Sequence, residues 1–184
     1  MIKTQELGGI SIVYWTNDKE PSAGRRDVIF IHGSGAEHTV WELQYENLQD
    51  RFNLFALDLP GHGASGGSGE QDIAAYVEWI RKFITALDLK KPVLVGHSLG
   101  AAICLSFAIR YGDLLSAAVP LSGGVRMPVN PLILDGFRKD PVATVNMTWK
   151  FAVAKQNREK LAHRLEKNLG NLKPEISIGD YVLT

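Results

Sequence analysis

Short runs of apolar residues alternate along the chain with longer stretches in which apolar residues recur at helical spacing. The runs at residues 28–31, 52–57, 92–95 and 117–121 predict strands, and uninterrupted runs are typical of strands covered on both faces. Residues 71–87 carry apolar side chains every three or four positions, which predicts an amphipathic helix. The alternation favours the α/β class, with a mostly parallel sheet and flanking helices.

Local signals add a hairpin and two further helices. The pair Gly8-Gly9 precedes apolar residues 10–15, which predicts two antiparallel strands joined at the glycines. Helices are expected at about 39–48 and at 98–111. The pattern changes after residue 124, because residues 125–184 hold no clear long strand and the part at about 141–169 has helical spacing. We therefore expect a core over residues 1–124 and a helical region over residues 125–184.

Composition narrows the class of partner. Lys plus Arg and Asp plus Glu each number 20 among 184 residues, so the formal net charge is zero. A neutral chain without a basic run gives no reason to expect nucleic acid or an anionic membrane as partner. Cys104, the single cysteine, excludes an intrachain disulfide and is expected to be an inert buried thiol. With neither a signal core nor an apolar run of about 20 residues, a cytoplasmic protein is predicted.

The pentapeptide Gly96-His97-Ser98-Leu99-Gly100 matches the pattern G-x-S-x-G. A predicted strand precedes it and a predicted helix follows it, which is the context that a serine nucleophile requires. The turn lifts the Ser98 hydroxyl from the sheet to a helix N-terminus, where N–H groups favour developing negative charge. The alternative is a helix N-cap serine after a glycine turn. The combination of strand, motif and helix favours Ser98 as the nucleophile, with His97 among the substrate-binding residues.

A glycine-rich loop, His32-Gly33-Ser34-Gly35, follows the strand predicted at 28–31. Attack on an ester carbonyl creates an oxyanion that needs fixed hydrogen-bond donors, and glycines let backbone N–H groups approach it. The N–H groups of Ser34 and Leu99 are the candidate donors. The alternative for this loop is an ordinary turn at the end of a strand, with a structural histidine.

These two motifs, with Asp58-Leu59-Pro60-Gly61-His62-Gly63-Ala64-Ser65 between them, resemble the α/β-hydrolase family in order and context. The resemblance is to the branch with carboxylesterases, lactonases, cofactor-free haloperoxidase-like enzymes and carbon–carbon bond hydrolases. It implies the α/β-hydrolase fold, with residues 1–124 as the N-terminal part of the core and 125–184 as part of a helical cap. It also implies that the loop at 58–65 is structural, and His62 with it.

The family's remaining catalytic residues are expected outside this chain. In this fold the order along the chain is Ser, then Asp or Glu, then His. The one histidine after Ser98 is His163, in a charged helical segment that favours an exposed histidine on a cap helix. Asp135 follows three apolar residues, and a cap helix is favoured there over a strand that carries an acid. The sheet would then have an open edge, which a separate C-terminal fragment or a second copy would cover.

The sequence therefore predicts a serine hydrolase for a small ester, lactone or related carbonyl substrate, acting through an acyl-serine intermediate without cofactor. No metal is expected, because His32, His38 and His97 lack the spacing of metal ligands. Two alternatives stay open. One is a hydrolase-like protein that binds a small ligand without turnover, and the other is lyase or perhydrolase chemistry at the same site.

Overall fold

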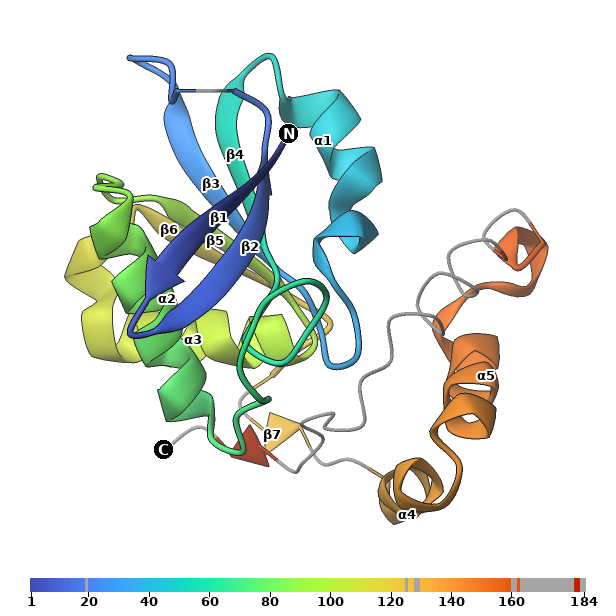
Figure 1. Ribbon diagram of the computed structural model, residues 1–184. Coiled ribbons are helices and arrows are strands. Elements are labelled where there is room, and N and C mark those ends of the chain that lie inside the picture. The colour runs from blue at the N-terminus through green and yellow to red at the C-terminus, as the bar shows by residue number, and fades with distance from the viewer. Residues whose placement is uncertain (19, 125, 128–129, 160–161, 163–180, 183–184) are drawn as a thin grey trace.

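The computed structural model describes residues 1–184 except 19, 125, 128–129, 160–161, 163–180 and 183–184. Its centre is a six-stranded sheet in the order β1-β2-β4-β3-β5-β6 (Figure 1). The strands β2, β4 and β3 lie inside the sheet together with β5, while β1 and β6 are its edges. The bounds are β1 Ile2–Leu7, β2 Ile10–Thr16, β3 Arg26–Ile31, β4 Phe52–Leu57, β5 Val93–His97 and β6 Ala117–Leu121.

The sheet is antiparallel at one end and parallel over the rest. β1 pairs with β2 and β2 pairs with β4 in antiparallel register. The turn between β1 and β2 has φ 58° at Gly8 and φ 84° at Gly9, and two positive φ values in succession favour glycine at both positions. β4, β3, β5 and β6 are parallel to one another. The predicted hairpin, the mostly parallel sheet and the α/β class are confirmed.

Five α-helices and three short 3₁₀ segments are described. The helix α2 starts where the Asp72 side chain accepts a hydrogen bond from the N–H of Ala74. None of the described helices combines the length and apolarity that crossing a membrane requires. The helices are α1 Glu42–Leu48, α2 Ile73–Ala86, α3 Leu99–Tyr111, α4 Pro131–Lys139 and α5 Pro141–Ala152, and the 3₁₀ segments are η1 His38–Trp41, η2 Gly112–Leu114 and η3 Lys155–Asn157.

Beyond β6 the described chain is mainly helical, as the sequence predicts for that part. In Figure 1, α4 and α5 lie to one side, away from the six-stranded sheet. They pack on each other, and a Cβ added at Gly136 would lie 2.6 Å from Oγ1 of Thr144. Two short strands, β7 Arg126–Met127 and β8 Tyr181–Val182, pair with each other in antiparallel register.

The core forms two layers because successive strand residues point to opposite faces. On β3, Val28 and Phe30 pack against Trp41 and the rest of the layer beneath α1. Ile29 and Ile31, both fully buried, pack on the other face against residues of α2 and α3. The central strands are thereby covered on both faces, which is why they read as uninterrupted apolar runs.

The strand β6 is covered less well than the strands inside the sheet. It pairs with β5 on one side, and no described strand pairs with its other side. Val119 and Leu121 are each 40% exposed. They lie opposite Val95 and His97 in the β5–β6 register and so share a face with them. What covers this edge stays a prediction.

Candidate active site

Ser98 is the single residue between the end of β5 and the start of α3. Its backbone has φ 54° and ψ −112°, a combination that residues with a Cβ rarely adopt. The Ser98 N–H donates to the carbonyl of Leu121 over 3.0 Å, and the Ser98 carbonyl accepts from the N–H of Ala101 over 2.9 Å. Ser98 therefore stands at a sharp turn between β5 and α3, and its backbone dihedrals lie in a disfavoured region.

Two glycines of the motif allow this turn to close. A Cβ added at Gly96 would lie 2.0 Å from the carbonyl oxygen of Gly100, and 2.7 Å from Sγ of Cys104. A Cβ added at Gly100 would lie 2.2 Å from the carbonyl oxygen of Ile31 at the end of β3. Backbone therefore passes directly against backbone at both positions, and only glycine leaves the space.

The loop at 32–35 lies against Ser98. A Cβ added at the buried Gly33 would lie 3.2 Å from Cβ of Ser98 and 3.3 Å from Nδ1 of His97. The fold thus brings together Gly33, His97 and Ser98, which the sequence analysis placed at one site. Ser34 is exposed, and Gly35 next to it has φ 69°. Desolvation lowers the pKa of His97, so its ring is neutral at neutral pH.

Backbone N–H groups are available at the start of α3. Leu99 is its first residue, and the first N–H groups of a helix have no acceptor within the helix. The helix dipole adds a partial positive charge at the same end. The surroundings of Ser98 are therefore suited to a negative charge that develops on a reacting carbonyl oxygen.

The fully buried His32 holds the loop in place. Its Nε2 accepts a hydrogen bond from the N–H of Leu59 over 3.0 Å, so its Nδ1 carries the proton and donates to the carbonyl of Gly33 over 2.7 Å. Burial and the neighbouring His62 ring lower the pKa of His32 to about 3. A histidine that stays neutral and is bonded at both nitrogens positions Gly33 and is not a general base.

A hydrogen-bonded pair of side chains that the sequence analysis missed, His38 and Asp58, lies beside this loop. Nδ1 of His38 is 2.8 Å from Oδ1 of Asp58, which also accepts from the His38 N–H, and Oδ2 accepts from the N–H of Ala64 over 2.9 Å. Burial alone would raise the pKa of Asp58, but these hydrogen bonds outweigh it and lower the pKa. No short spacing joins positions 38 and 58, so a sequence pattern carries no signal for the pair.

The same pair is part of the group whose geometry comes nearest to a metal site in the described part of the chain. Ligand atoms of Glu37, His38 and Asp58 lie within 4.8 Å of one another. Both oxygens of Asp58 already accept hydrogen bonds from the protein, and Oε1 of Glu37 accepts one from Thr39. The donor set is thus engaged in holding the loop after β4 against the loop after β3.

The candidates for acid and base fall elsewhere. Asp135 lies on α4, where its exposed carboxylate pairs with Arg138 over 3.2 Å. The helix begins there because Asn130 caps it and Pro131 occupies its first turn, so this segment is a helix and not a strand. Its place in a cap stays a prediction. His163 lies outside the described residues.

Burial raises the pKa of the Cys104 thiol, which keeps it protonated.

A model of the alpha/beta hydrolase fold family matches residues 28–178. The chain belongs to the α/β-hydrolase family. The predicted fold is confirmed, since the mostly parallel six-stranded sheet and its flanking helices are those of the family.

Proteins similar to this chain in sequence or in fold include some named as an esterase or a lactonase. The chain is 38% identical over 89 residues to putative esterase/lipase 2 of Mycoplasma pneumoniae, which covers 47% of this chain and 33% of that protein. The fold is similar to a hydrolase from Pseudomonas aeruginosa, with a TM-score of 0.79, 17% identity and coverage of 93% and 66%. The enol-lactonase of Burkholderia xenovorans gives a TM-score of 0.76, 14% identity and coverage of 92% and 66%. The chain spans about a third of the length of the curated relatives it matches.

Proposed function

We propose that the protein is a serine hydrolase, with Ser98 as the nucleophile, for a small ester, lactone or related carbonyl substrate. The observation that carries the proposal is the backbone of Ser98, held at φ 54° between β5 and α3 with Gly33 against it. Such a conformation costs about 1–3 kcal/mol and persists only where the surroundings impose it. A serine that served only as a helix cap would not need it. Names of relatives such as esterase/lipase support the reaction class.

The proposed reaction proceeds through an acyl-serine intermediate. Oγ of Ser98 attacks the carbonyl carbon of the substrate while its proton passes to a general base, and the carbonyl oxygen becomes an oxyanion. The N–H groups of Leu99 and Ser34 donate to that oxyanion. Collapse of the intermediate expels the alcohol, which takes the proton. Water then attacks the acyl-serine ester, releases the carboxylic acid and restores the Ser98 hydroxyl.

The general base and the acid that orients it belong, in this proposal, to polypeptide that pairs with β6. Val119 and Leu121 expose apolar surface there, and the side of β6 with which no described strand pairs offers backbone groups to a further strand. Ser98 itself is tied to this strand by its hydrogen bond to Leu121. A separate C-terminal fragment or a second copy of this chain would each bring new residues close to Ser98.

A fluorophosphonate probe tests the nucleophile. In protein assembled with the polypeptide that supplies the general base, we expect the probe to label Ser98, as mapped by mass spectrometry, and the label to be lost in Ser98→Ala. Ser106→Ala, about two helix turns further along α3, is the matched control and should label as the wild type does. Label on another residue, or label that survives Ser98→Ala, would refute the serine mechanism and favour the ligand-binding alternative.

Turnover of a p-nitrophenyl ester tests the origin of the base separately. Residues 1–184 alone should show only residual hydrolysis, because a serine without its base stays protonated. His163→Ala should leave that residual rate unchanged. Robust turnover that His163→Ala abolishes would place the base within this chain and would leave the role of Ser98 intact.

A further inference from the structure

Two pairs of adjacent basic residues meet at the amino ends of the parallel strands. Arg25-Arg26 stands at the start of β3, and Lys90-Lys91 stands just before β5. Val28 and Val93 are partners in the β3–β5 register, so Arg26 and Lys91, each two residues earlier, come to the same end of neighbouring strands. Like charges brought together in this way repel each other.

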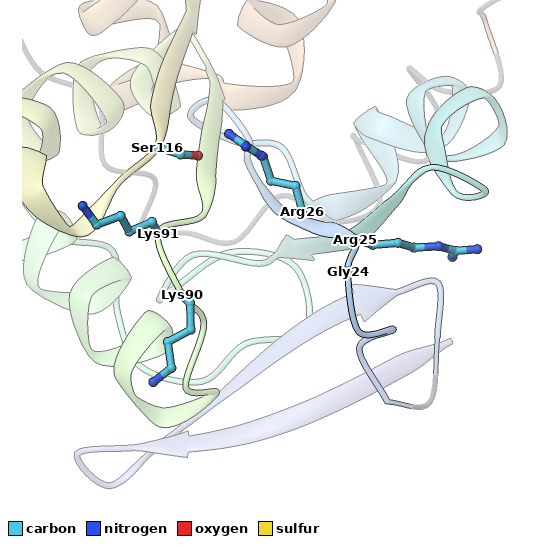
Figure 2. Close-up of a pocket in the computed structure, with 6 residues that line it drawn as sticks. All are labelled: Gly24, Arg25, Arg26, Lys90, Lys91 and Ser116. Atoms are coloured by element: carbon cyan, nitrogen blue, oxygen red, sulfur yellow. The ribbon is translucent and has the colours of Figure 1, made fainter.

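A pocket of about 390 Å³ opens between these residues, and Gly24 and Ser116 complete its lining (Figure 2). Its volume falls within the range of about 300–1,000 Å³ found for small-molecule sites. Four of the six lining residues are cationic and none is acidic. Arg26 reaches toward Ser116, while Arg25, Lys90 and Lys91 point away from it and from one another.

Neighbouring carboxylates balance only half of this charge. Arg25 pairs with Asp18 over 3.3 Å, and Lys90 pairs with Asp88. Within the described part of the chain, neither Arg26 nor Lys91 takes part in an ion pair. About two of the four positive charges around the pocket are therefore without a carboxylate partner among the described residues, in a protein whose formal net charge is zero.

We propose that this pocket binds a small anion that carries a diphosphate or triphosphate group. Two uncompensated cations match an anion with several negative charges, and a guanidinium group beside a hydroxyl offers the donors that phosphate oxygens accept. The site is distinct from the one at Ser98, since the two lie at opposite ends of the parallel strands. The five residues of β5 separate them by about 16 Å. This inference does not depend on the proposed hydrolase activity.

Titration with inorganic tripolyphosphate at low ionic strength tests the site. Isothermal calorimetry of residues 1–184 should give saturable binding with one ligand per chain. The double variant Arg26→Gln/Lys91→Gln should weaken binding at least tenfold, because it removes the uncompensated charges. The matched control Arg110→Gln/Lys139→Gln removes the same charge from exposed positions on α3 and α4 and should bind within twofold of wild type. Circular dichroism checks that both variants fold, and loss of a repulsive pair should not destabilise the first.

Further arms identify the chemistry that is recognised. Sulfate at matched ionic strength should bind at least tenfold more weakly than tripolyphosphate. ATP that binds as tripolyphosphate does would assign the site to the phosphate chain alone, and tighter binding of ATP would add a nucleoside contact; both support the proposal. Absence of saturable binding, equal binding of sulfate, or equal losses in the two double variants would overturn it.

Discussion

Gly100→Ala places one methyl group where the start of α3 crosses the end of β3. The added Cβ would lie 2.2 Å from the carbonyl oxygen of Ile31 and 2.8 Å from that of His32. Both obstacles are backbone atoms next to the buried sheet, so no side chain can rotate out of the way. Contact at an ordinary distance requires α3 to move by about 1 Å. Overpacking of this kind typically costs about 1–3 kcal/mol, and we expect about 3 kcal/mol here because rigid elements meet on both sides.

Urea unfolding followed by circular dichroism measures this cost. For a slope of about 2 kcal/mol per molar urea, a loss of about 3 kcal/mol lowers the midpoint by about 1.5 M. Gly112→Ala, at the C-cap of α3, is the matched control, because Gly112 has φ −55° and a Cβ added there meets nothing within 4 Å. That variant should be neutral or more stable by about 0.4–1 kcal/mol.

The comparison of the two alanine variants decides whether the close approach is real. If Gly100→Ala were as stable as Gly112→Ala, α3 could not sit against β3 as described. A second readout follows from the site: α3 carries the N–H of Leu99, so a shift of its first turn moves this donor relative to Gly33. A folded Gly100→Ala protein should therefore react more slowly with a fluorophosphonate probe, and Gly112→Ala should react at the wild-type rate.

Three further predictions follow from the described geometry. Ser98→Gly should be about 1 kcal/mol more stable toward urea than Ser98→Ala, because only glycine adopts φ 54° freely; equal stabilities would contradict the strain. The free energy of unfolding should be at its full value above about pH 6.5 and lower by about 1.4 kcal/mol at about pH 5.5. The reason is that His32 takes up a proton in the unfolded chain but stays neutral in the folded protein, where its pKa is about 3. His32→Gln should flatten this pH dependence, and an unchanged slope would refute the explanation. Val119→Lys/Leu121→Lys should reduce self-association of this chain in light scattering, since both residues expose apolar surface beside the open edge; unchanged scattering would show that this edge is not the contact.

Local sequence patterns predicted most of the sheet. β4 and β6 match the predicted runs 52–57 and 117–121 at both ends. β5 runs on through Gly96 to His97, two residues past its apolar run, because His97 still pairs with Leu121 of β6. That extension is set by a neighbouring strand, and an apolar pattern along one segment cannot reveal it.

The candidate site likewise has one part that the sequence predicts and parts that it does not. The turn at Ser98 could be predicted because strand, motif and helix are contiguous in the sequence. The pair of His38 and Asp58 could not, since its members are brought together only by the sheet order that places β4 beside β3. The basic pocket was missed for the same reason: each contributing dipeptide is too short to count as a basic run, and only the parallel register joins Arg26 to Lys91.

The two ends of the parallel strands would stabilise a negative charge in different ways. At the carboxyl ends of the strands, the donors proposed for the oxyanion are backbone N–H groups such as that of Leu99, fixed by the turn and partly shielded from water. At the amino ends, the donors are exposed side chains such as Arg26 and Lys91. Salt screens the attraction between these side chains and an anion within about 10 Å at 0.1 M ionic strength. Raising the salt concentration should therefore weaken tripolyphosphate binding steeply while the rate of fluorophosphonate labelling at Ser98 changes little. If the affinity for tripolyphosphate and the labelling rate fell together, the two ends of the strands would not act as independent sites. The proposal of two distinct sites would then be wrong.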